Sequence, residues 1–408
     1  MPKNLRLFTT SYPYGYGENF LDDELPILSK YFNNITIQPM TFGDNLVPRQ
    51  LPVDVGVLLP IMPTSKTRKI AVGICDFFKF SHLRNDFFRN KIFCSFTKFK
   101  LYIVAVALIH YWKKRIFEKT TDEIFYFYWG IGACYIIPFL NNSGKNRIII
   151  RLHGNDLYEY LSNNYNPLRN EIYSTADILC PVSEYGRQYL ISRYPQFANK
   201  VTLARLGTRD CCMGPCTPSP GHLTIVTCCY LVPLKRIHVL AECLKELDAN
   251  ATHITWHHFG DGPELNKIET IISEFPRHIS TILHGRCSNK NIFDFYATNH
   301  IDAFISVSET EGVPFSVMEA TSFGIPVIAT NVGGTSEILH PEGAIKLAAD
   351  FTQQELIDAI MKVKALACSR EIRQKIRRNW QEKASAEINY KLFAEEILLP
   401  KDPRLCVA

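Results

Sequence analysis

The chain has 408 residues, of which 46% are hydrophobic and 21% charged, and its formal net charge is +5. At about 100–200 residues per domain this length predicts two or three domains, and the composition is that of a globular protein. Disordered chains, collagen and small disulfide-stapled scaffolds are therefore excluded.

The N-terminal half alternates strand-like and helical patterns. Strands are predicted at residues 5–9, 35–38, 124–128, 147–152 and 178–182, and the first helix at 20–31. Each strand pattern is followed by a loop and then by helical periodicity. This alternation favours a mostly parallel, doubly wound sheet.

Residues 207–222 interrupt this alternation with a sequence rich in Gly, Pro and Cys, which is typical of a linker. The alternation then restarts, with strands predicted at 223–228, 253–259, 279–283, 303–307 and 327–329. Helices are predicted at 236–248, 263–274, 289–299, 314–323, 353–367 and about 370–398. We expect an α/β protein with two Rossmann-like β/α/β domains that face each other across a cleft, with the ligand at the carboxyl ends of the strands.

The expected domains are residues 1–207 and 208–384, with a C-terminal helix at about 385–408 that packs back on the first domain. The 13 cysteines contain no C-x-x-C pair, and the cluster Cys211, Cys212, Cys216 has no matching His/Cys set nearby. We therefore expect no metal site, and structural thiols in a reducing cytoplasm.

The N-terminal sequence lacks the apolar core of a signal peptide, and the longest clean apolar run, residues 101–112, is shorter than the ~20 residues of a spanning helix. The expected location is the cytoplasm, either free or peripherally on the inner face of the cell membrane.

Charge is concentrated in residues 65–120. This segment has 13 Lys/Arg against three acidic residues and interleaves them with a dozen aromatic residues. One interpretation is a buried aromatic core with solvated cations. The other is an anionic membrane surface bound through cations such as Lys113, Lys114 and Arg115. Single-stranded nucleic acid also uses such surfaces, but it is not the expected partner.

The clearest chemical pattern runs from Ser308 to Ala320. The predicted strand 303–307 leads into a loop with Glu311 and Gly312, Pro314 opens a helix, and Glu319 lies on that helix. The backbone around the helix start, which suits an anion or a ring of hydroxyls, is formed by Gly312, Val313, Pro314, Phe315 and Ser316.

Two glutamates separated by seven residues, the first followed by Gly, resemble the signature of the retaining nucleotide-sugar glycosyltransferases of the GT-B fold, in particular the large family 4. The sequence GIPVIATNVGG at 324–334 resembles the continuation of that signature. The resemblance implies that Glu311 contacts the donor sugar and that Glu319 binds the ribose of the nucleotide.

A second segment, residues 230–236, resembles the G-R-L-x-x-x-K-G loop of the same family, whose cations neutralise the donor diphosphate. Lys235 takes the position of the Lys, whereas Tyr230 replaces the Arg, and Arg236 is the candidate substitute. Cations suit this place because negative charge grows on the leaving diphosphate.

Two further matches lie in the N-terminal half. Residues 151–156, RLHGND, resemble the family's H-G-x-D segment, which implies that His153 bonds a hydroxyl of the donor sugar. Gly15-Tyr16-Gly17 lacks the third glycine of a dinucleotide fingerprint. In the family this loop approaches the donor phosphate or the acceptor, so Gly17 is a donor-binding candidate.

The resemblance implies a hexosyltransferase-type glycosyltransferase (EC 2.4) that retains anomeric configuration and needs no cofactor. A nucleotide-diphosphate sugar would be its donor and a saccharide or lipid-linked saccharide its acceptor, in the biosynthesis of a bacterial surface polysaccharide such as capsule, O-antigen or exopolysaccharide. The expected catalytic residues are Glu311, His153 and Lys235. The alternatives are a sugar phosphorylase, a sugar-nucleotide epimerase or an NAD-dependent oxidoreductase.

Overall fold

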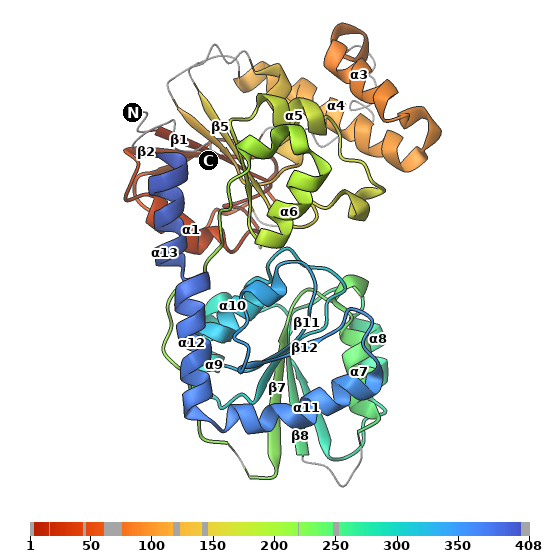
Figure 1. Cartoon of the computed structure of the whole chain (residues 1–408), viewed down its shortest axis with the longest axis vertical. Coiled ribbons are helices and arrows are strands. Elements are labelled where there is room, and N and C mark those ends of the chain that lie inside the picture. The colour runs from red at the N-terminus through yellow and green to blue at the C-terminus, as the bar shows by residue number, and fades with distance from the viewer. Residues whose placement is uncertain are drawn as a thin grey trace. The chain divides into compact units, whose positions relative to one another are not determined.

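The computed structural model describes residues 4–15, 17–43, 46–60, 76–116, 123–140, 146–218, 220–247 and 253–400. The chain divides into two units, one formed by Met1–Arg205 with Tyr390–Ala408 and the other by Leu206–Asn389 (Figure 1). Each unit contains a six-stranded sheet in which the neighbouring strands run parallel. The predicted α/β class is therefore confirmed.

The sheet of the first unit has the order β3-β2-β1-β4-β5-β6. Its strands are β1 (Asn4–Thr9), β2 (Asn34–Pro39), β3 (Val55–Val57), β4 (Ile124–Phe127), β5 (Arg147–Leu152) and β6 (Ile178–Pro181). Its helices are α1 (Leu21–Leu28), α3 (Ser81–Arg89), η1 (Ile92–Cys94), α4 (Phe96–Ile116), η2 (Gly132–Phe139), η3 (Glu159–Ser162), α5 (Arg169–Thr175), α6 (Glu184–Arg193) and η4 (Pro195–Lys200).

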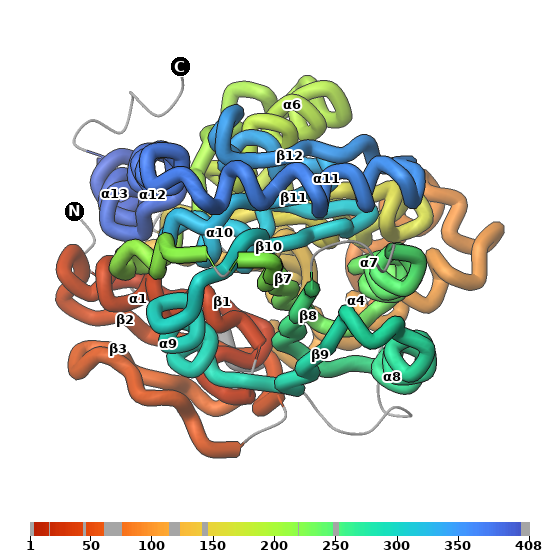
Figure 2. Tube along the Cα trace, turned by 90° about the horizontal axis from the view of Figure 1, so that it is seen from below, coloured from red at the N-terminus to blue at the C-terminus, as the bar shows by residue number. Residues whose placement is uncertain are grey.

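The second unit repeats this topology, in the order β12-β11-β10-β7-β8-β9. Its strands are β7 (His222–Cys228), β8 (His253–Phe259), β9 (Ile279–Leu283), β10 (Ala303–Ser306), β11 (Val327–Thr330) and β12 (Ala344–Leu347). Its helices are η5 (Pro233–Lys235), α7 (Ile237–Lys245), α8 (Leu265–Ile272), α9 (Asn289–Thr298), α10 (Phe315–Ser322), η6 (Thr335–Glu337), α11 (Gln353–Ala367) and α12 (Arg370–Ala384). Helices α7 and α8 lie side by side, and α11 contacts β10, β11 and β12 (Figure 2).

Both sheets have the strand order of a Rossmann fold. In such sheets the order reverses between the first and fourth strands, and ligands bind beyond the carboxyl ends of the strands at that switch point. The switch points lie between β1 and β4 in the first unit and between β7 and β10 in the second. The loops that follow these four strands are therefore the first places to look for a site.

Side chains of the first sheet alternate between two cores. Phe125 and Phe127 of β4 belong to one hydrophobic cluster, and Ile124 and Tyr126 belong to another. A parallel sheet covered on both faces requires such all-apolar strands. The second cluster also contains residues of η7 (Phe393–Leu398), so the end of the described chain packs within the first unit.

The predicted helix at about 370–398 is interrupted in the structure. Ser385 is extended between α12 and α13 (Ala386–Leu392), and it pairs with Thr208. Thr208 donates its N–H to Ala384 O at 2.9 Å and accepts from Ala386 N at 3.0 Å. Gly207 permits this pairing, because a Cβ there would lie 2.5 Å from the backbone of Ala386.

The basic segment 65–120 forms α3, η1 and α4 where it is described; residues 65–75 and 117–120, and the side chains of Lys114 and Arg115, lie outside the described part. Tyr102 and Trp112 are buried in the first core. Five phenylalanines are exposed instead, namely Phe78, Phe88, Phe93, Phe96 and Phe99. The aromatic residues thus divide between core and surface. No helix among the described residues is both long and apolar enough to cross a membrane.

A buried ion pair and its contacts join four elements of the first unit. Arg151 of β5 and Glu24 of α1 are both fully buried, with 3.1 Å between Nη1 and Oε2, and the Tyr126 hydroxyl donates to Glu24 Oε1 at 2.9 Å. The Arg151 guanidinium also lies 4.1 Å from the ring centre of Phe393 in η7. Burial raises the pKa of Glu24, and Arg151 opposes that shift.

We expect Arg151→Met to lower the free energy of unfolding of the first unit by about 3–5 kcal/mol, because it leaves the Glu24 carboxyl buried without its cation. Hydrogen exchange of the β5 amides at increasing urea concentration measures this loss. Glu24 would then be protonated in the folded state with a raised pKa, so the loss should grow as pH rises through that pKa. The double variant Arg151→Met, Glu24→Gln should recover much of the stability, and a double variant no more stable than Arg151→Met would contradict the argument.

Candidate functional site

Two loops meet at the switch point of the second unit. One follows β7 and contains η5 and Arg236; the other follows β10 and leads to α10. Glu309 donates its N–H to Leu234 O at 2.9 Å, which holds the two loops together. The residues predicted to bind the donor diphosphate and sugar therefore lie in adjacent loops.

Lys235 and Glu311 form an ion pair across these loops. The distance between Lys235 Nζ and Glu311 Oε1 is 2.5 Å, and the two side chains are 24% and 12% exposed. Burial acts to lower the pKa of Lys235, but the Glu311 carboxylate outweighs it, so this pKa lies above its usual value. The predicted pair of catalytic residues is thus in contact, and the ammonium stays charged.

Arg236, the predicted substitute for the missing arginine, faces backbone carbonyl groups. Its Nε donates to Val307 O and its Nη1 to Ala349 O, both at 2.7 Å, and its Nη2 donates to Ser308 O at 3.3 Å. Burial lowers the pKa of Arg236. These contacts favour a role in holding the loop after β10, and its donor-binding role stays a prediction. Tyr230, at the position of the family's arginine, is 54% exposed.

Close backbone contacts fix the loop that carries Glu311. Gly333 has φ +54°, and a Cβ there would lie 1.8 Å from Glu311 O, so only glycine fits without a shift of the loop. Gly334 donates its N–H to Gly312 O at 2.8 Å. Gly333 of the predicted G-G sequence therefore allows the close backbone contact with Glu311, and Gly334 adds a hydrogen bond to Gly312.

Helix α10 begins directly after this loop. Pro314 is its N-cap residue, and Val317 and Met318 donate their N–H groups to Pro314 O. The first turn of a helix carries the positive end of the helix dipole. This geometry agrees with the predicted anion-binding backbone of Gly312, Val313, Pro314, Phe315 and Ser316, which stays a prediction.

Glu319 lies one turn further along α10 and is 8% exposed. Asn289 of α9 donates from Nδ2 to Glu319 Oε1 at 3.4 Å. Burial raises the pKa of Tyr296, also on α9, and the charge of Glu319 adds to that effect. The Tyr296 hydroxyl is buried without a hydrogen-bond partner. Sequence reasoning missed Asn289 and Tyr296, because α9 carries no motif.

Beside these residues two aromatic rings stack at the ends of β8 and β9. The ring centres of Phe259 and His284 are 4.1 Å apart and the rings are nearly parallel. Phe259 begins the sequence F-G-D-G-P, in which Gly260 allows the backbone to pass close to Cys229. The Phe259 ring lies 6.4 Å from the Tyr296 ring, centre to centre, so the stack adjoins α9.

His153 follows β5 in the first unit and is held by its own loop. Asp156 accepts from the backbone N–H groups of His153 and Gly130, each at 2.8 Å. The His153 ring lies 4.4 Å from the Trp129 ring, centre to centre. Burial lowers the pKa of His153 against the raising effect of Asp156, and Nε2 is buried without a partner. A neutral imidazole placed this way suits hydrogen bonding to a hydroxyl group.

Gly17 lies in the loop after β1, which is fixed by two side chains that sequence reasoning missed. Arg49 donates from Nη2 to Gly17 O at 2.9 Å. The Glu18 carboxylate accepts from the N–H groups of Thr10, Ser11 and Tyr12 and from Trp129 Nε1 at 2.7 Å. Trp129 therefore connects the Gly17 loop with His153 at the switch point of the first unit, while Tyr16 lies outside the described residues.

Among the described residues no group of three or more His, Cys, Asp or Glu side chains is arranged to hold a metal ion. Among the described cysteines, which include Cys211, Cys212 and Cys216, none forms a disulfide bond.

Comparisons with known proteins match the second unit most specifically. Residues 220–385 match the family model described as Glycosyl transferases group 1. One component of the human phosphatidylinositol N-acetylglucosaminyltransferase is 28% identical over 46% of this chain and 41% of its own length. A putative colanic acid biosynthesis glycosyltransferase, WcaL of Salmonella typhimurium, is 24% identical over 48% of this chain and 50% of its own. The chain thus spans about half the length of these curated relatives or less.

The fold match covers nearly the whole chain. The crystal structure of Anabaena HepE in complex with UDP and glucose superposes with a TM-score of 0.64 at 13% identity, over 97% of this chain and 99% of HepE. The findings support a GT-B glycosyltransferase. The prediction of the GT-B fold is confirmed, and the relatives support the prediction of a transferase enzyme, whereas family 4 and retention of configuration stay predictions.

The ion pair gives a direct test of the site. In Glu311→Gln the carboxylate that raises the pKa of Lys235 is gone while burial still lowers it, so this pKa should fall. An NMR pH titration of the lysine ε-carbon signals measures the change. The variant Glu309→Gln, which changes a neighbouring carboxylate, is the control and should shift the Lys235 pKa less. An unchanged Lys235 pKa in Glu311→Gln would show that the two groups do not pair in solution.

Proposed function

We propose that the chain transfers a sugar from a nucleotide-diphosphate sugar to a saccharide or lipid-linked saccharide acceptor with retention of anomeric configuration. The observation that carries this proposal is the Lys235–Glu311 ion pair at the switch point of the second unit, beside the N-terminus of α10. A charged ammonium and a helix dipole at one strand edge suit a diphosphate leaving group. In this proposal the second unit binds the donor and the first binds the acceptor.

The residues of the second unit take distinct roles in the proposed reaction. Lys235 and the first turn of α10 stabilise the negative charge that grows on the diphosphate as its bond to the anomeric carbon breaks. Glu311 orients Lys235 and accepts from hydroxyls of the donor sugar. Glu319, buried on the same helix, accepts from the ribose hydroxyls. For His153 we propose a hydrogen bond from Nε2 to a sugar hydroxyl.

The proposed step proceeds on one face of the sugar. The bond between the anomeric carbon and the diphosphate oxygen breaks through an oxocarbenium-like state. The acceptor hydroxyl oxygen forms the new bond to that carbon, and its proton passes to the departing phosphate oxygen. None of the residues in the predicted site is assigned as a covalent nucleophile, and the proposed step needs no cofactor.

The acceptor proposal draws on the relatives. WcaL is named for colanic acid biosynthesis, and another relative, TuaC of Bacillus subtilis, for teichuronic acid biosynthesis. We therefore propose that the product belongs to a surface polysaccharide. Because HepE was solved with UDP, uridine diphosphate is the first nucleotide to test.

A thermal-shift screen of UDP-, GDP- and ADP-sugars tests the donor proposal, since a bound ligand raises the melting temperature by mass action. We expect one nucleotide to stabilise the protein. Calorimetry with that nucleotide should show about 10- to 150-fold weaker binding to Glu319→Ala, because losing a hydrogen bond to a charged group costs about 1.5–3 kcal/mol.

The matched control for this measurement is Glu269→Ala, which removes an exposed glutamate from α8 of the same unit. It should bind the nucleotide as the unchanged protein does. Equal affinity in a folded Glu319→Ala variant would refute the ribose role, and no stabilisation by any nucleotide sugar would refute the donor class.

For the exposed part of the basic segment we propose peripheral binding to an anionic membrane surface, on the cytoplasmic side. Phe88, Phe93 and Phe96 are 62–83% exposed. The neighbouring cations Lys79, Lys91 and Lys100 are exposed as well. Exposed aromatic rings settle at the headgroup level, and each nearby cation adds about 1 kcal/mol at an anionic surface. Lys113 is less available, because it lies 3.6 Å from Asp76 and over the Phe80 ring.

We expect the protein to sediment with vesicles that contain phosphatidylglycerol, less at high salt, and not with neutral phosphatidylcholine vesicles. Phe93→Ser with Phe96→Ser should weaken sedimentation, because it removes apolar area that the headgroup region would bury. The control pair Val53→Ser, Leu59→Ser removes exposed apolar side chains elsewhere in the first unit and should have no effect. Equal recovery with both vesicle types at low salt would refute membrane binding.

A further inference from the structure

The first unit contains a polar pocket that none of the predicted site residues lines. It has a volume of about 250 Å³ and is bordered by the end of α3, the segment from η3 to α5, and the segment from α6 to η4. This volume is below the ~300–1,000 Å³ of pockets for drug-sized ligands, so it suits one small ring.

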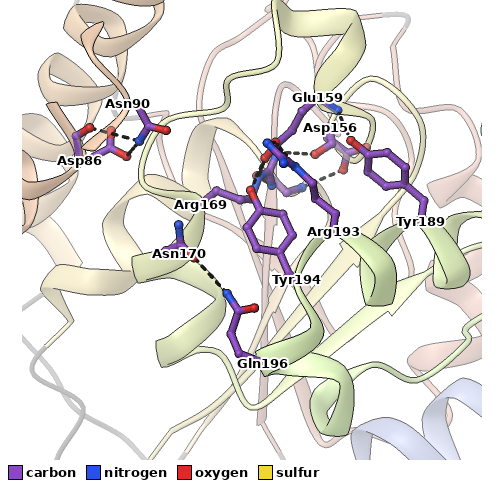
Figure 3. Close-up of polar contacts among 11 residues, drawn as sticks. Asp86, Asn90, Asp156, Glu159, Arg169, Asn170, Tyr189, Arg193, Tyr194 and Gln196 are labelled. Carbon is purple, nitrogen blue, oxygen red and sulfur yellow. Dashed lines mark hydrogen bonds and ion pairs between the residues drawn. The ribbon is translucent and has the colours of Figure 1, made fainter. Parts of the chain in front are cut away.

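Two arginines in the pocket wall share one carboxylate. Arg169 Nε lies 3.7 Å and Arg193 Nη2 lies 3.2 Å from the carboxylate of Glu159. The Tyr194 hydroxyl also donates to Glu159. Figure 3 shows these three side chains converging on Glu159. The guanidinium charges are therefore already engaged, which disfavours an anion as the ligand.

A second carboxylate completes the charge balance. Asp86 is buried and accepts from Asn90 Nδ2 at 2.9 Å and from the Tyr165 hydroxyl at 2.5 Å. Burial raises the pKa of Asp86 to about 6. Above that pH the pocket has two arginines and two carboxylates and is close to neutral overall.

Side-chain amides supply the remaining polar groups, namely Asn90, Asn164, Asn166, Asn170 and Gln196. Asn170 and Gln196 face each other in Figure 3, with 3.3 Å between Oδ1 and Nε2. Asn166 is only 6% exposed, and its Nδ2 is buried without a hydrogen-bond partner. A buried amide donor without a partner is costly, so it calls for an acceptor that the protein does not supply.

We infer that this pocket binds a neutral, hydroxyl-rich ring, that is, one sugar residue of a saccharide. Each hydroxyl group both donates and accepts, as the lining amides do, and a neutral ring needs no counter-charge. Asn166 Nδ2 donates to one ring hydroxyl in this arrangement. The inference rests on the proposed function only in naming a saccharide as the natural ligand.

Arg169 connects this pocket with the His153 loop. Its Nη1 donates to Gly130 O at 2.8 Å and its Nη2 to Asp156 O at 2.6 Å. Asp156 in turn accepts from the backbone N–H of His153. A sugar bound against Arg169 therefore touches the same hydrogen-bonded network that holds His153.

Saturation-transfer difference NMR on the full chain tests the inference, with methyl glycosides of glucose, galactose and N-acetylglucosamine as probes. We expect the unchanged protein to transfer saturation to at least one of the glycosides, which shows that it binds. Asn166→Ala should weaken binding by about 3- to 10-fold through the loss of one neutral hydrogen bond, and Asn166→Leu, which also fills the pocket, should abolish it. If the Asn166 variants do not fold, Asn170→Ala and Gln196→Ala, at more exposed positions, replace them in the binding measurement and should also weaken glycoside binding.

The matched control is Asn85→Ala, an exposed asparagine of α3 outside the pocket, which should bind glycosides normally. Glu319→Ala should also keep glycoside binding, and Asn166→Ala should keep nucleotide binding, so failure of the donor proposal is distinguishable from failure of this one. The inference is overturned if no glycoside is saturated or if all variants bind equally. It is also overturned if inorganic phosphate binds and Asn166→Leu abolishes that binding.

Discussion

The Lys235–Glu311 ion pair is the interaction on which the proposed chemistry of the second unit depends. A partly buried ammonium loses hydration, which acts to lower its pKa, and the Glu311 carboxylate 2.5 Å away outweighs that effect and raises the pKa of Lys235. That carboxylate is in place because Gly333 and Gly334 let one loop lie directly against another. The topology brings the loops together in the first place, since β7 and β10 are neighbours at a switch point. The position of Glu311 beside Lys235 thus depends both on the backbone conformation of Gly333 and on the order of the strands in the sheet.

The two units share a strand order, but the loops at their switch points carry different side chains. In the second unit the loops carry a cation, a carboxylate and a helix N-terminus. In the first unit, the Glu18 carboxylate accepts hydrogen bonds from three backbone N–H groups and from Trp129. The His153 ring lies against that tryptophan. The first site is therefore aromatic, and its carboxylates, Glu18 and Asp156, are engaged by backbone N–H groups. Such a surface suits the hydroxyls and ring faces of a sugar, whereas the second suits phosphate charge.

Sequence patterns predicted the elements that carry strong local signals. The strand at 147–152 and the helix at 353–367 match the structure to the residue, and Pro314 does precede α10. The strands β3 and β12 were not predicted, because three or four partly exposed residues at a sheet edge show no clear alternation. The interruption at Ser385 depends on pairing with Thr208, a contact between distant segments that no local pattern contains. The same limit explains why Asn289, Tyr296 and Glu18 escaped sequence reasoning.

Arg236 shows why a sequence motif alone does not establish that a cationic side chain contacts the phosphate. Its position beside Lys235 suggests a second phosphate contact, yet its guanidinium binds the carbonyls of Val307, Ser308 and Ala349, the last of which is 113 residues away. If these contacts persist when a donor binds, Lys235 is the only cation of the 229–236 loop that faces the growing charge. The dipole at the start of α10 must then supply the rest of the stabilisation, and a dipole falls off within one helical turn. In the proposed reaction the diphosphate therefore has to lie directly against residues 312–316, which ties donor binding to the loop that Gly333 holds in place.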